Sequence, residues 1–417
     1  MKKVTFAILG MGNRGTAYAS KQLKFPDEME VTAMADPRPS RLEAANKYLH
    51  LPKERLFASG EEMLKQPKMA DIMIIASQDA QHRDHAIAAM KQGYDLLLEK
   101  PIAASKEDCR AIMEAAHQYH RRVIVCHVLR YTVFYQQIKK WISSGVIGDI
   151  RAIDAEEMIG YYHYAHSFVR GNWHRREECS PLILAKCCHD LDLFLWLTGK
   201  SCKSVSSFGS QSYFTAENCP EGAKERCSDG CTVDCPFHAP KFYFSRIPGW
   251  PANVLHPEPT EENIMQVLLT GNYGRCVYKM DNNMVDRQVV NMLLEDGVTV
   301  GFCVNAFTQH QDRRIHVMGT KGDIVGTFKK NDLKLQVFGQ PDVTADLTAQ
   351  CTDFSGHGGG DGRLIYDVIR LYRGDDFDTS AITVIDRSTE SHMVAFAAEQ
   401  SRLQEGKLVD LEQFCKE

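Results

Sequence analysis

The chain has 417 residues, a length that fits two domains. Of these residues 44% are hydrophobic and 25% are charged, which is typical of a globular protein. Its formal net charge is −5 and no run of Lys or Arg exceeds two residues, which argues against nucleic acid or an anionic membrane as a partner. There is no apolar stretch of about 18 residues that could span a membrane and no signal peptide before the first apolar strand, so we expect a cytoplasmic protein.

Strand and helix patterns alternate over residues 1–126. Short apolar runs predict buried strands at residues 4–9, 31–35, 71–76, 95–98 and 123–126. Helical periodicity lies between them, from residue 14 onward and at residues 41–48, 82–92 and 106–117. This alternation predicts an α/β domain with a doubly wound parallel sheet.

The pattern changes after residue 126. Helical periodicity predicts helices at residues 134–144, 364–371 and 388–404. Runs rich in β-branched and aromatic residues predict strands at residues 150–158, 204–213, 264–269, 276–280, 288–294, 298–304, 314–319, 324–328 and 334–338. We therefore expect residues 127–417 to form an α+β domain on a large, mostly antiparallel sheet, with a cysteine-rich insertion at about 215–260.

The first predicted strand ends in a glycine-rich turn. Gly10, Gly12 and Gly15 have the G-x-G-x-x-G spacing, and Asp36 ends the second apolar run. Gly10 permits a tight strand-to-helix turn, Gly12 lets backbone approach a pyrophosphate, and Gly15 lets the helix pack close to the strand. The helix N-terminus would face the phosphates, and Asp36 would accept hydrogen bonds from the adenosine ribose. Together these features predict a dinucleotide site in a Rossmann domain; the alternative is a glycine-rich turn in a Rossmann domain that binds no cofactor.

The acid at position 36 also indicates which dinucleotide binds. A 2′-phosphate about 4 Å from the Asp36 carboxylate would be repelled by about 1 kcal/mol in water and by about 4 kcal/mol near a protein surface. This repulsion favours NAD over NADP. Arg38 can neutralise a phosphate, so the preference is not absolute.

Five motifs together resemble the Gfo/Idh/MocA oxidoreductases, the family of glucose–fructose oxidoreductase and inositol dehydrogenase. They are G-M-G-N-R-G at 10–15, A-S-Q-D-A-Q-H at 76–82, E-K-P at 99–101, G-V-I-G-D-I at 145–150 and H-D-L-D at 189–192. The second is a variant of the family's A-T-P-N-x-x-H, and the third is the most specific. The resemblance covers nearly the whole chain.

This resemblance implies an N-terminal Rossmann domain, a C-terminal sheet domain, NAD(P) as the cofactor, and a sugar, cyclitol or glycoside as the substrate. It also implies a homodimer or homotetramer formed through the open face of the sheet. The residues that it assigns to the cofactor are Gly10, Met11, Gly12, Asn13, Arg14, Gly15, Asp36, Arg38, Ser77, Gln78, His82, Glu99 and Lys100.

Two residues are predicted to act on the substrate hydroxyl. Lys100 follows a parallel strand, at the edge where such sheets bind ligands, and the family commonly holds the following proline cis. A lysine there can orient the hydroxyl and polarise the developing carbonyl; the alternative is a surface lysine before a turn. The resemblance places a general base or acid at His189, and an imidazole exchanges protons near neutral pH; the alternative is a core histidine.

The sequence departs from the family one helical turn before this histidine. Many members carry Asp at the position of Ala185. Lys186 lies three residues before His189, on roughly the same face of the expected helix, so we predict that it replaces the carboxylate as a substrate contact in catalysis. Asp192 is expected either to orient the imidazole or to form a salt bridge on the helix surface.

Further residues are candidates for the substrate pocket. Sugars stack on aromatic faces and hydrogen-bond to Arg and His, and glycoside-active relatives carry a segment similar to the one at 357–361; the alternative is a flexible glycine loop. The candidates are Arg130, Tyr131, Trp173, Asp192, His357 and Asp361.

A polar segment holds four of the 14 cysteines. Cys219, Cys227, Cys231 and Cys235 lie within 17 residues. Four thiolates satisfy tetrahedral zinc, which would staple a loop that has little core of its own. An iron–sulphur cluster is a second interpretation, because Cys-Pro occurs twice, and free thiols or disulfides are a third. His238 is a spare ligand.

Three functions remain open. The favoured one is NAD-dependent oxidation of a secondary hydroxyl of a sugar, cyclitol or glycoside. The first alternative is an NAD-dependent glycosidase that oxidises its substrate transiently and cleaves the glycosidic bond by elimination. The second is a non-catalytic sugar or NAD sensor, against which the presence of both Lys100 and His189 argues.

Overall fold

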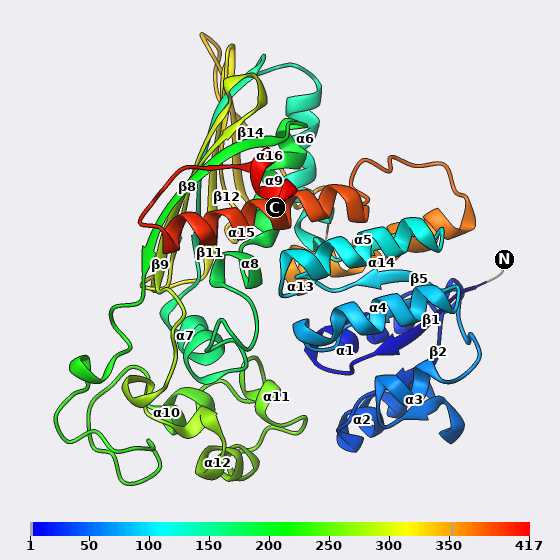
Figure 1. The fold of residues 1–417 in the computed structure, drawn as a ribbon, viewed down its shortest axis with the longest axis vertical. Coiled ribbons are helices and arrows are strands. Elements are labelled where there is room, and N and C mark those ends of the chain that lie inside the picture. Colours follow the sequence, from blue (N-terminus) through cyan, green and yellow to red (C-terminus); the bar gives the residue numbers. More distant parts are fainter. Residues whose placement is uncertain (1–2, 352) are drawn as a thin grey trace.

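The computed structural model describes residues 3–351 and 353–417, which form two sheets with helices packed around them (Figure 1). The first sheet has six parallel strands in the order β3-β2-β1-β4-β5-β6. They are β1 (Val4–Leu9), β2 (Met29–Ala35), β3 (Leu56–Phe57), β4 (Ile72–Ile75), β5 (Asp95–Leu98) and β6 (Val123–Val125). A strand covered on both faces must be apolar throughout, and all four residues of β4 are buried.

Helices connect these strands. They are α1 (Asn13–Ala19), α2 (Pro39–Leu49), α3 (Gly60–Leu64), α4 (His82–Lys91) and α5 (Lys106–Gln118). Serine N-caps fix where two of them begin, because the hydroxyls of Ser59 and Ser105 each accept a hydrogen bond from a backbone N–H three residues further on.

The second sheet has nine strands in the order β14-β13-β12-β11-β7-β10-β9-β8-β15. The pair β7–β10 is parallel and the other pairs are antiparallel. The strands are β7 (Ile150–Met158), β8 (Cys202–Ser210), β9 (Arg287–Leu294), β10 (Thr299–Asn305), β11 (Asp312–Gly319), β12 (Gly322–Thr327), β13 (Asp332–Val337), β14 (Val343–Thr344) and β15 (Val409–Asp410). The predicted fold class, a Rossmann-type parallel sheet followed by a large, mostly antiparallel sheet, is confirmed.

Helices pack on one face of the second sheet. They include α6 (Val133–Ser143), α9 (Cys188–Thr198), α15 (Ile385–Leu403) and α16 (Leu411–Lys416), and α15 runs along the sheet on the side of the first domain (Figure 1). Exposed apolar side chains lie on strands of the same sheet, among them the cross-strand neighbours Phe208 and Val289.

The chain returns to the first domain near its end. The short helix α13 (Ser355–Gly358) leads into α14 (Gly360–Arg373), which buries its apolar face in the same core as Phe6 of β1. Val125 at the end of β6 donates its backbone N–H to Thr383 O (2.8 Å). Residues 360–383, which belong to the predicted second domain, thus pack on the Rossmann domain.

The insertion is a small helical unit at the end of the second domain (Figure 1). It contains α10 (Ala239–Phe244), α11 (Ala252–Leu255) and α12 (Glu261–Thr270). These helices share a separate apolar core that includes Phe242, Tyr243, Ile264 and Leu268. Within the described part of the chain, no helix is both long and apolar enough to cross a membrane.

Two strands predicted for this region are wrong. Residues 264–269 lie in α12, and residues 276–280 contain a 3₁₀ turn at Val277–Lys279. The apolar run at 264–269 is compatible with a strand or a helix, and the N-cap residue that precedes it favours the helix. Thr260 accepts a hydrogen bond from Asn263 N (3.1 Å), and two glutamates follow in the first turn, so the helix begins there.

Candidate active site

The carboxyl ends of four strands bring the predicted cofactor residues to one edge of the parallel sheet. The glycine loop follows β1, Asp36 follows β2, residues 76–82 follow β4, and Glu99 follows β5. Strands β1 and β4 are neighbours although β2 and β3 separate them in sequence, so the strand order reverses here. Open α/β sheets bind their ligands at such a point.

The glycine loop is packed so tightly that two of its glycines have no room for a side chain. Gly10 has a φ of +95°, and a Cβ there would lie 2.4 Å from Ala76 O. A Cβ on Gly15 would lie 1.9 Å from Gly10 O. Near Gly12, by contrast, a Cβ would meet only the guanidinium of Arg41, at 3.2 Å. This part of the loop presents bare backbone, as the approach of a pyrophosphate requires.

Asp36 is buried beside this loop, with 4% of its surface exposed. Its Oδ2 accepts a hydrogen bond from Met11 N and its Oδ1 accepts one from Arg38 N, both at 2.9 Å. The guanidinium of Arg41 lies 3.6 Å from the carboxylate. Because a carboxylate has about four acceptor positions, two remain for ribose hydroxyls. Met11 and Arg38, both predicted to bind the cofactor, thus orient Asp36 through their backbone.

Arg14 links the glycine loop to the end of β5 and to α14. Its Nε donates to Glu99 Oε1 (2.7 Å), and its two terminal nitrogens donate to the carboxylate of Asp361 (2.8 and 3.0 Å). His357 Nδ1 lies 3.1 Å from the same carboxylate. Burial raises the pKa of Glu99, but the charges of Arg14 and Lys100 outweigh burial and lower it overall. The structure thus joins a predicted cofactor residue to two predicted substrate residues.

The segment after β4 supports the E-K-P turn. His82 is buried, and its Nδ1 donates to Pro101 O (2.8 Å) while its Nε2 lies 3.2 Å from Ser77 O. The hydroxyl of Ser77 is 3.0 Å from His85 Nδ1. Of the other predicted cofactor residues, Gln78 and Asn13 are exposed at this edge.

Lys100 joins the two domains. It follows Glu99, the peptide to Pro101 is cis, and its ammonium donates to Ala185 O (3.1 Å) at the end of α8 (Leu182–Ala185). The lysine therefore points from the cofactor edge of the parallel sheet toward the end of α8, just before the helix α9 that carries His189.

His189 lies in the first turn of α9 and is 4% exposed. Among the described residues, its Nδ1 has no hydrogen-bond partner. Burial lowers the pKa of His189 well below its usual value, and the positive charge of Lys100 lowers it further. A neutral imidazole beside a lysine can accept a proton from a hydroxyl placed between the two groups.

The expected continuous helix before His189 is wrong, since the chain leaves helical geometry between α8 and α9. Lys186 occupies this break. Its ammonium lies 3.1 Å from Glu157 Oε1 on β7, and burial lowers its pKa, with help from the charges of Arg313 and Lys100. Lys186 thus lies near Lys100, although the helical-face argument that predicted it there does not hold.

Glu157 belongs to a buried ion-pair chain that includes Arg313 of β11. Arg313 Nη2 lies 2.8 Å from Glu157 Oε2, and its Nε donates to Asp190 Oδ1 (2.7 Å). All three side chains are at most 8% exposed. These ion pairs fix the second sheet, Lys186 and the start of α9 relative to one another.

Arg130 and Asp192 pair with each other. Two hydrogen bonds of 2.6 Å join the guanidinium to the carboxylate, and both residues are buried. Of the two interpretations of Asp192, the structure shows the salt bridge, which is buried and not on the helix surface. Tyr131 is also buried, with its hydroxyl 3.3 Å from Thr383 Oγ1, so it contributes to the core.

Trp173 borders the site from the second domain. Its indole N–H donates to Asp79 Oδ2 (3.2 Å), in the segment that follows β4. Burial raises the pKa of Asp79, although the charges of His82 and Lys100 oppose it. Asp79 and Trp173 thus lie on the same side of the site as Lys100.

Sequence reasoning missed His127, Glu157 and Arg313. The ring of His127 lies 5.6 Å from that of His189, and neither of its nitrogens has a hydrogen-bond partner within the described residues. A signal for Glu157 was present, because it shares the inward face of β7 with Ile153 and Ala155. An acid at such a position needs a buried partner.

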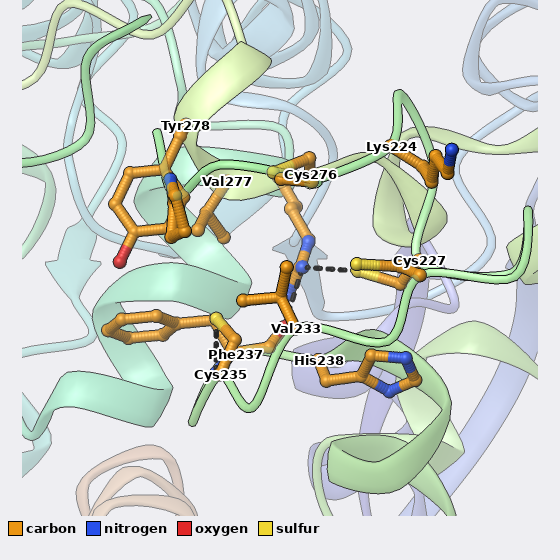
Figure 2. Close-up of a pocket in the computed structure, with 13 residues that line it drawn as sticks. Lys224, Cys227, Val233, Cys235, Phe237, His238, Cys276, Val277 and Tyr278 are labelled. Carbon is orange, nitrogen blue, oxygen red and sulfur yellow. Dashed lines mark hydrogen bonds between the residues drawn. The ribbon is translucent and has the colours of Figure 1, made fainter. Parts of the chain in front are cut away.

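The zinc site predicted at Cys219, Cys227, Cys231 and Cys235 is not formed. In residues 3–351 and 353–417, no group of three or more His, Cys, Asp or Glu side chains is placed to hold a metal ion. Cys227, Cys231 and Cys235 instead line one cavity together with Cys276, and Cys219 is outside its lining (Figure 2).

Two family models match the chain. Residues 4–127 match the NAD-binding Rossmann fold of the Gfo/Idh/MocA oxidoreductase family, and residues 139–381 match the C-terminal α/β domain of the same family. The chain belongs to the Gfo/Idh/MocA family of oxidoreductases. The resemblance inferred from the motifs is thus confirmed, and the N-terminal domain is an NAD-binding Rossmann fold.

Individual relatives support this assignment. YteT of Bacillus subtilis (strain 168) is 26% identical over 408 residues, which cover 90% of each chain. Inositol 2-dehydrogenase of Salmonella typhimurium is 27% identical over 203 residues, 48% of this chain and 56% of that enzyme. The fold matches that of WlbA dehydrogenase from Bordetella pertussis, solved with NADH and UDP-GlcNAcA, with a TM-score of 0.70, 19% identity and 98% of each chain covered. An inositol dehydrogenase homologue from Azotobacter vinelandii, solved with NAD+, gives a TM-score of 0.69 at 16% identity, with 98% of this chain and 97% of that chain covered.

Proposed function

We propose that the protein oxidises a secondary hydroxyl of a sugar, cyclitol or glycoside and transfers the hydride to NAD. The observation that carries this proposal is that Lys100, at the carboxyl end of β5, lies near enough to the buried His189 for its charge to lower the pKa of that imidazole, whose Nδ1 has no partner among the described residues. Similarity to inositol 2-dehydrogenase, an enzyme named for a cyclitol, supports the substrate class.

The roles follow from the geometry. The bare backbone at Gly12 and the carboxylate of Asp36 would hold NAD, which when bound accepts a hydride. Lys100, held by Ala185 O, orients the substrate hydroxyl and stabilises negative charge on its oxygen as the carbonyl forms. His189 accepts the hydroxyl proton. Lys186, fixed by Glu157, adds a second positive group for the polyol.

A substrate screen tests the proposal. The protein is incubated with NAD+ and panels of inositols, aldoses, sugar acids and aryl glycosides, and NADH formation is followed by absorbance. We expect NADH from at least one class of secondary alcohol. Release of the aglycone without net NADH would assign the protein to the oxidation–elimination glycosidases instead. If no class gave NADH or bond cleavage although NAD+ bound, the proposal would be rejected.

The preference for NAD over NADP is also a proposal. The Asp36 carboxylate should repel a 2′-phosphate by about 1–4 kcal/mol, although Arg41 at 3.6 Å and Arg38 at 3.8 Å oppose this. We expect Asp36→Ala to bring the dissociation constants for NAD and NADP, measured by fluorescence titration, closer to each other. Glu43→Ala, which removes an exposed acid from the same α2 helix, should leave the ratio unchanged. Tighter binding of NADP by the parent protein would contradict the assignment.

A further inference from the structure

His127 is a buried histidine behind the proposed base, and the mechanism so far gives it no role. It follows strand β6 and is 0% exposed. The rings of His189 and His392 pack edge-on against it, each with its centre 5.6 Å from that of His127. Neither nitrogen of His127 has a hydrogen-bond partner in residues 3–351 and 353–417. Because an unpaired buried polar group is costly, both nitrogens need partners close at hand.

The charge state of His127 fixes what those partners must be. Burial lowers the pKa of His127 well below its usual value, and the charges of Arg130 and Lys100 lower it further against the opposing charge of Glu99. The ring is therefore neutral near pH 7. A neutral imidazole has one N–H that donates and one bare nitrogen that accepts. His127 thus needs one acceptor and one donor.

Asp192 is the acceptor. Nε2 of His127 lies 3.8 Å from Asp192 Oδ1, so the N–H of His127 belongs on Nε2. Each oxygen of this carboxylate accepts one hydrogen bond from Arg130, and a carboxylate has about four acceptor positions, so room for another bond remains. A side-chain shift of about 0.6 Å brings the two atoms to about 3.2 Å, within the range of an N–H···O hydrogen bond.

The donor for Nδ1 of His127 must come from a neighbouring ring. His392 is already engaged, since its Nδ1 donates to Ser388 O (2.7 Å) and its Nε2 accepts from Ile102 N (2.9 Å). Nδ1 of His189, by contrast, is buried without a partner among the described residues. Two imidazoles joined by an N–H···N bond of about 2.9 Å have ring centres about 5 Å apart, close to the observed 5.6 Å.

This pairing decides which nitrogen of His189 faces the substrate as a base. If Nδ1 carries the proton of the ring and donates it to His127, Nε2 is left bare. Nε2 is also the nitrogen that a substrate can reach. Within the part of the chain that the structure describes it makes no hydrogen bond, and unlike Nδ1 it is not fully buried. Its lone pair is then free to accept the proton of a hydroxyl.

We propose that His127 is a positioning residue, which accepts a hydrogen bond from His189 Nδ1, donates one to Asp192, and so holds His189 in the tautomer whose Nε2 accepts the substrate proton. No proton passes along this chain. The hydroxyl proton stays on Nε2 of His189, and the Nδ1–H bond to His127 persists while the base is charged. The inference rests on the proposed role of His189 as the base.

Kinetics with the substrate found in the screen are the first test. His127→Phe keeps a ring but removes both nitrogens. It should lower kcat about 10- to 100-fold, the scale seen when the partner that orients a metal-binding histidine is removed, and leave KM and NAD affinity nearly unchanged. His127→Gln should keep most of the activity, because its amide both accepts and donates.

The adjacent core residue supplies a matched control. Val128 is 1% exposed and has no polar side-chain atom, so Val128→Ala should lower the free energy of unfolding and leave kcat unchanged. A kcat like that of the parent in His127→Phe, or equal losses of kcat in the Phe and Gln variants, would overturn the proposal.

A second measurement needs no substrate. Nitrogen NMR of the NAD-bound protein with isotope-labelled histidine shows which ring nitrogen carries the proton. Of the 16 histidines, His189 is identified by the signal that its alanine variant loses. We expect the proton on Nδ1 in the parent and in His127→Gln, but not in His127→Phe. If the Phe variant does not fold, the parent spectrum still decides.

The NMR result separates this inference from the proposed function. A proton on Nε2 of His189 in the parent, or the same tautomer in the parent and in His127→Phe, would contradict the role of His127. A proton on Nδ1 in the parent that is lost in His127→Phe would support that role even if the screen found no substrate, and only the proposed function would then be rejected.

Discussion

Replacing Lys100 or His189 by alanine is expected to lower turnover at least about 10²-fold, the scale of general acid–base effects, and to leave NAD binding nearly unchanged. Lys100 would no longer orient the hydroxyl, or His189 would no longer accept its proton. The measurement is kcat together with NAD affinity by titration. Lys91→Ala and His117→Ala, exposed on α4 and α5, serve as controls and should keep full activity. Full activity in either active-site variant would remove that residue from the mechanism.

The dependence of kcat on pH gives a second readout of the same pair. Burial, and then the charge of Lys100, lower the pKa of His189, so its neutral form should persist well below pH 6.5, the usual midpoint for histidine. Activity should therefore hold on the acid side until the imidazole is protonated. Removing the positive neighbour favours the protonated form, so the residual activity of Lys100→Met should be lost at a higher pH than in the parent. A shift to lower pH would contradict this account of His189.

Replacing Arg313 by methionine is expected to lower the free energy of unfolding by about 3–5 kcal/mol, the scale for removing one partner of a buried ion pair. The side chain of Glu157 is 0% exposed and that of Asp190 is 5% exposed, and the substitution would leave both with a buried negative charge that Arg313 no longer compensates. Kinetic parameters should also change, because Glu157 holds Lys186 at the site.

The adjacent residue supplies a matched control. Arg314 is 65% exposed and lies 3.5 Å from Glu156, so Arg314→Met should change the unfolding free energy by less than about 1 kcal/mol. Both variants are compared with the parent by denaturant unfolding under identical conditions. Equal effects of the two substitutions would show that the buried ion-pair chain does not carry the stability assigned to it.

Local patterns predicted most of the fold. The strand at 150–158 has the bounds of β7, and five of the six strands of the parallel sheet were expected within a few residues, because apolar runs and glycine turns are local signals. The short strand β3 was not predicted. The helix at 261–270 was missed because its apolar run is ambiguous and the cap at Thr260 was not recognised. The packing of α14 against the first domain could not be predicted. Its periodicity shows that one face of the helix is apolar, but it does not show which domain that face packs against.

The site was less predictable, because its contacts join distant segments. The glycine spacing, Asp36 and the E-K-P motif indicated the cofactor edge. The pairing of Asp192 with Arg130 has no local signature, and spacing left open whether Asp192 would orient His189 or form a salt bridge on the helix surface. Likewise, spacing grouped Cys219 with three other cysteines, whereas the fold places Cys276 there.

Deuterium transfer from substrate to cofactor tests most directly whether the protein moves a hydride from the carbinol carbon to NAD. The substrate found in the screen is labelled at the carbinol carbon and incubated with NAD+ and the parent protein, and the mass of the cofactor is measured. We predict that NADH gains one deuterium and that the His189→Ala variant shows this transfer at least about 10²-fold more slowly. Product formation with no deuterium in the cofactor would contradict hydride transfer, and with it the roles of Lys100 and His189.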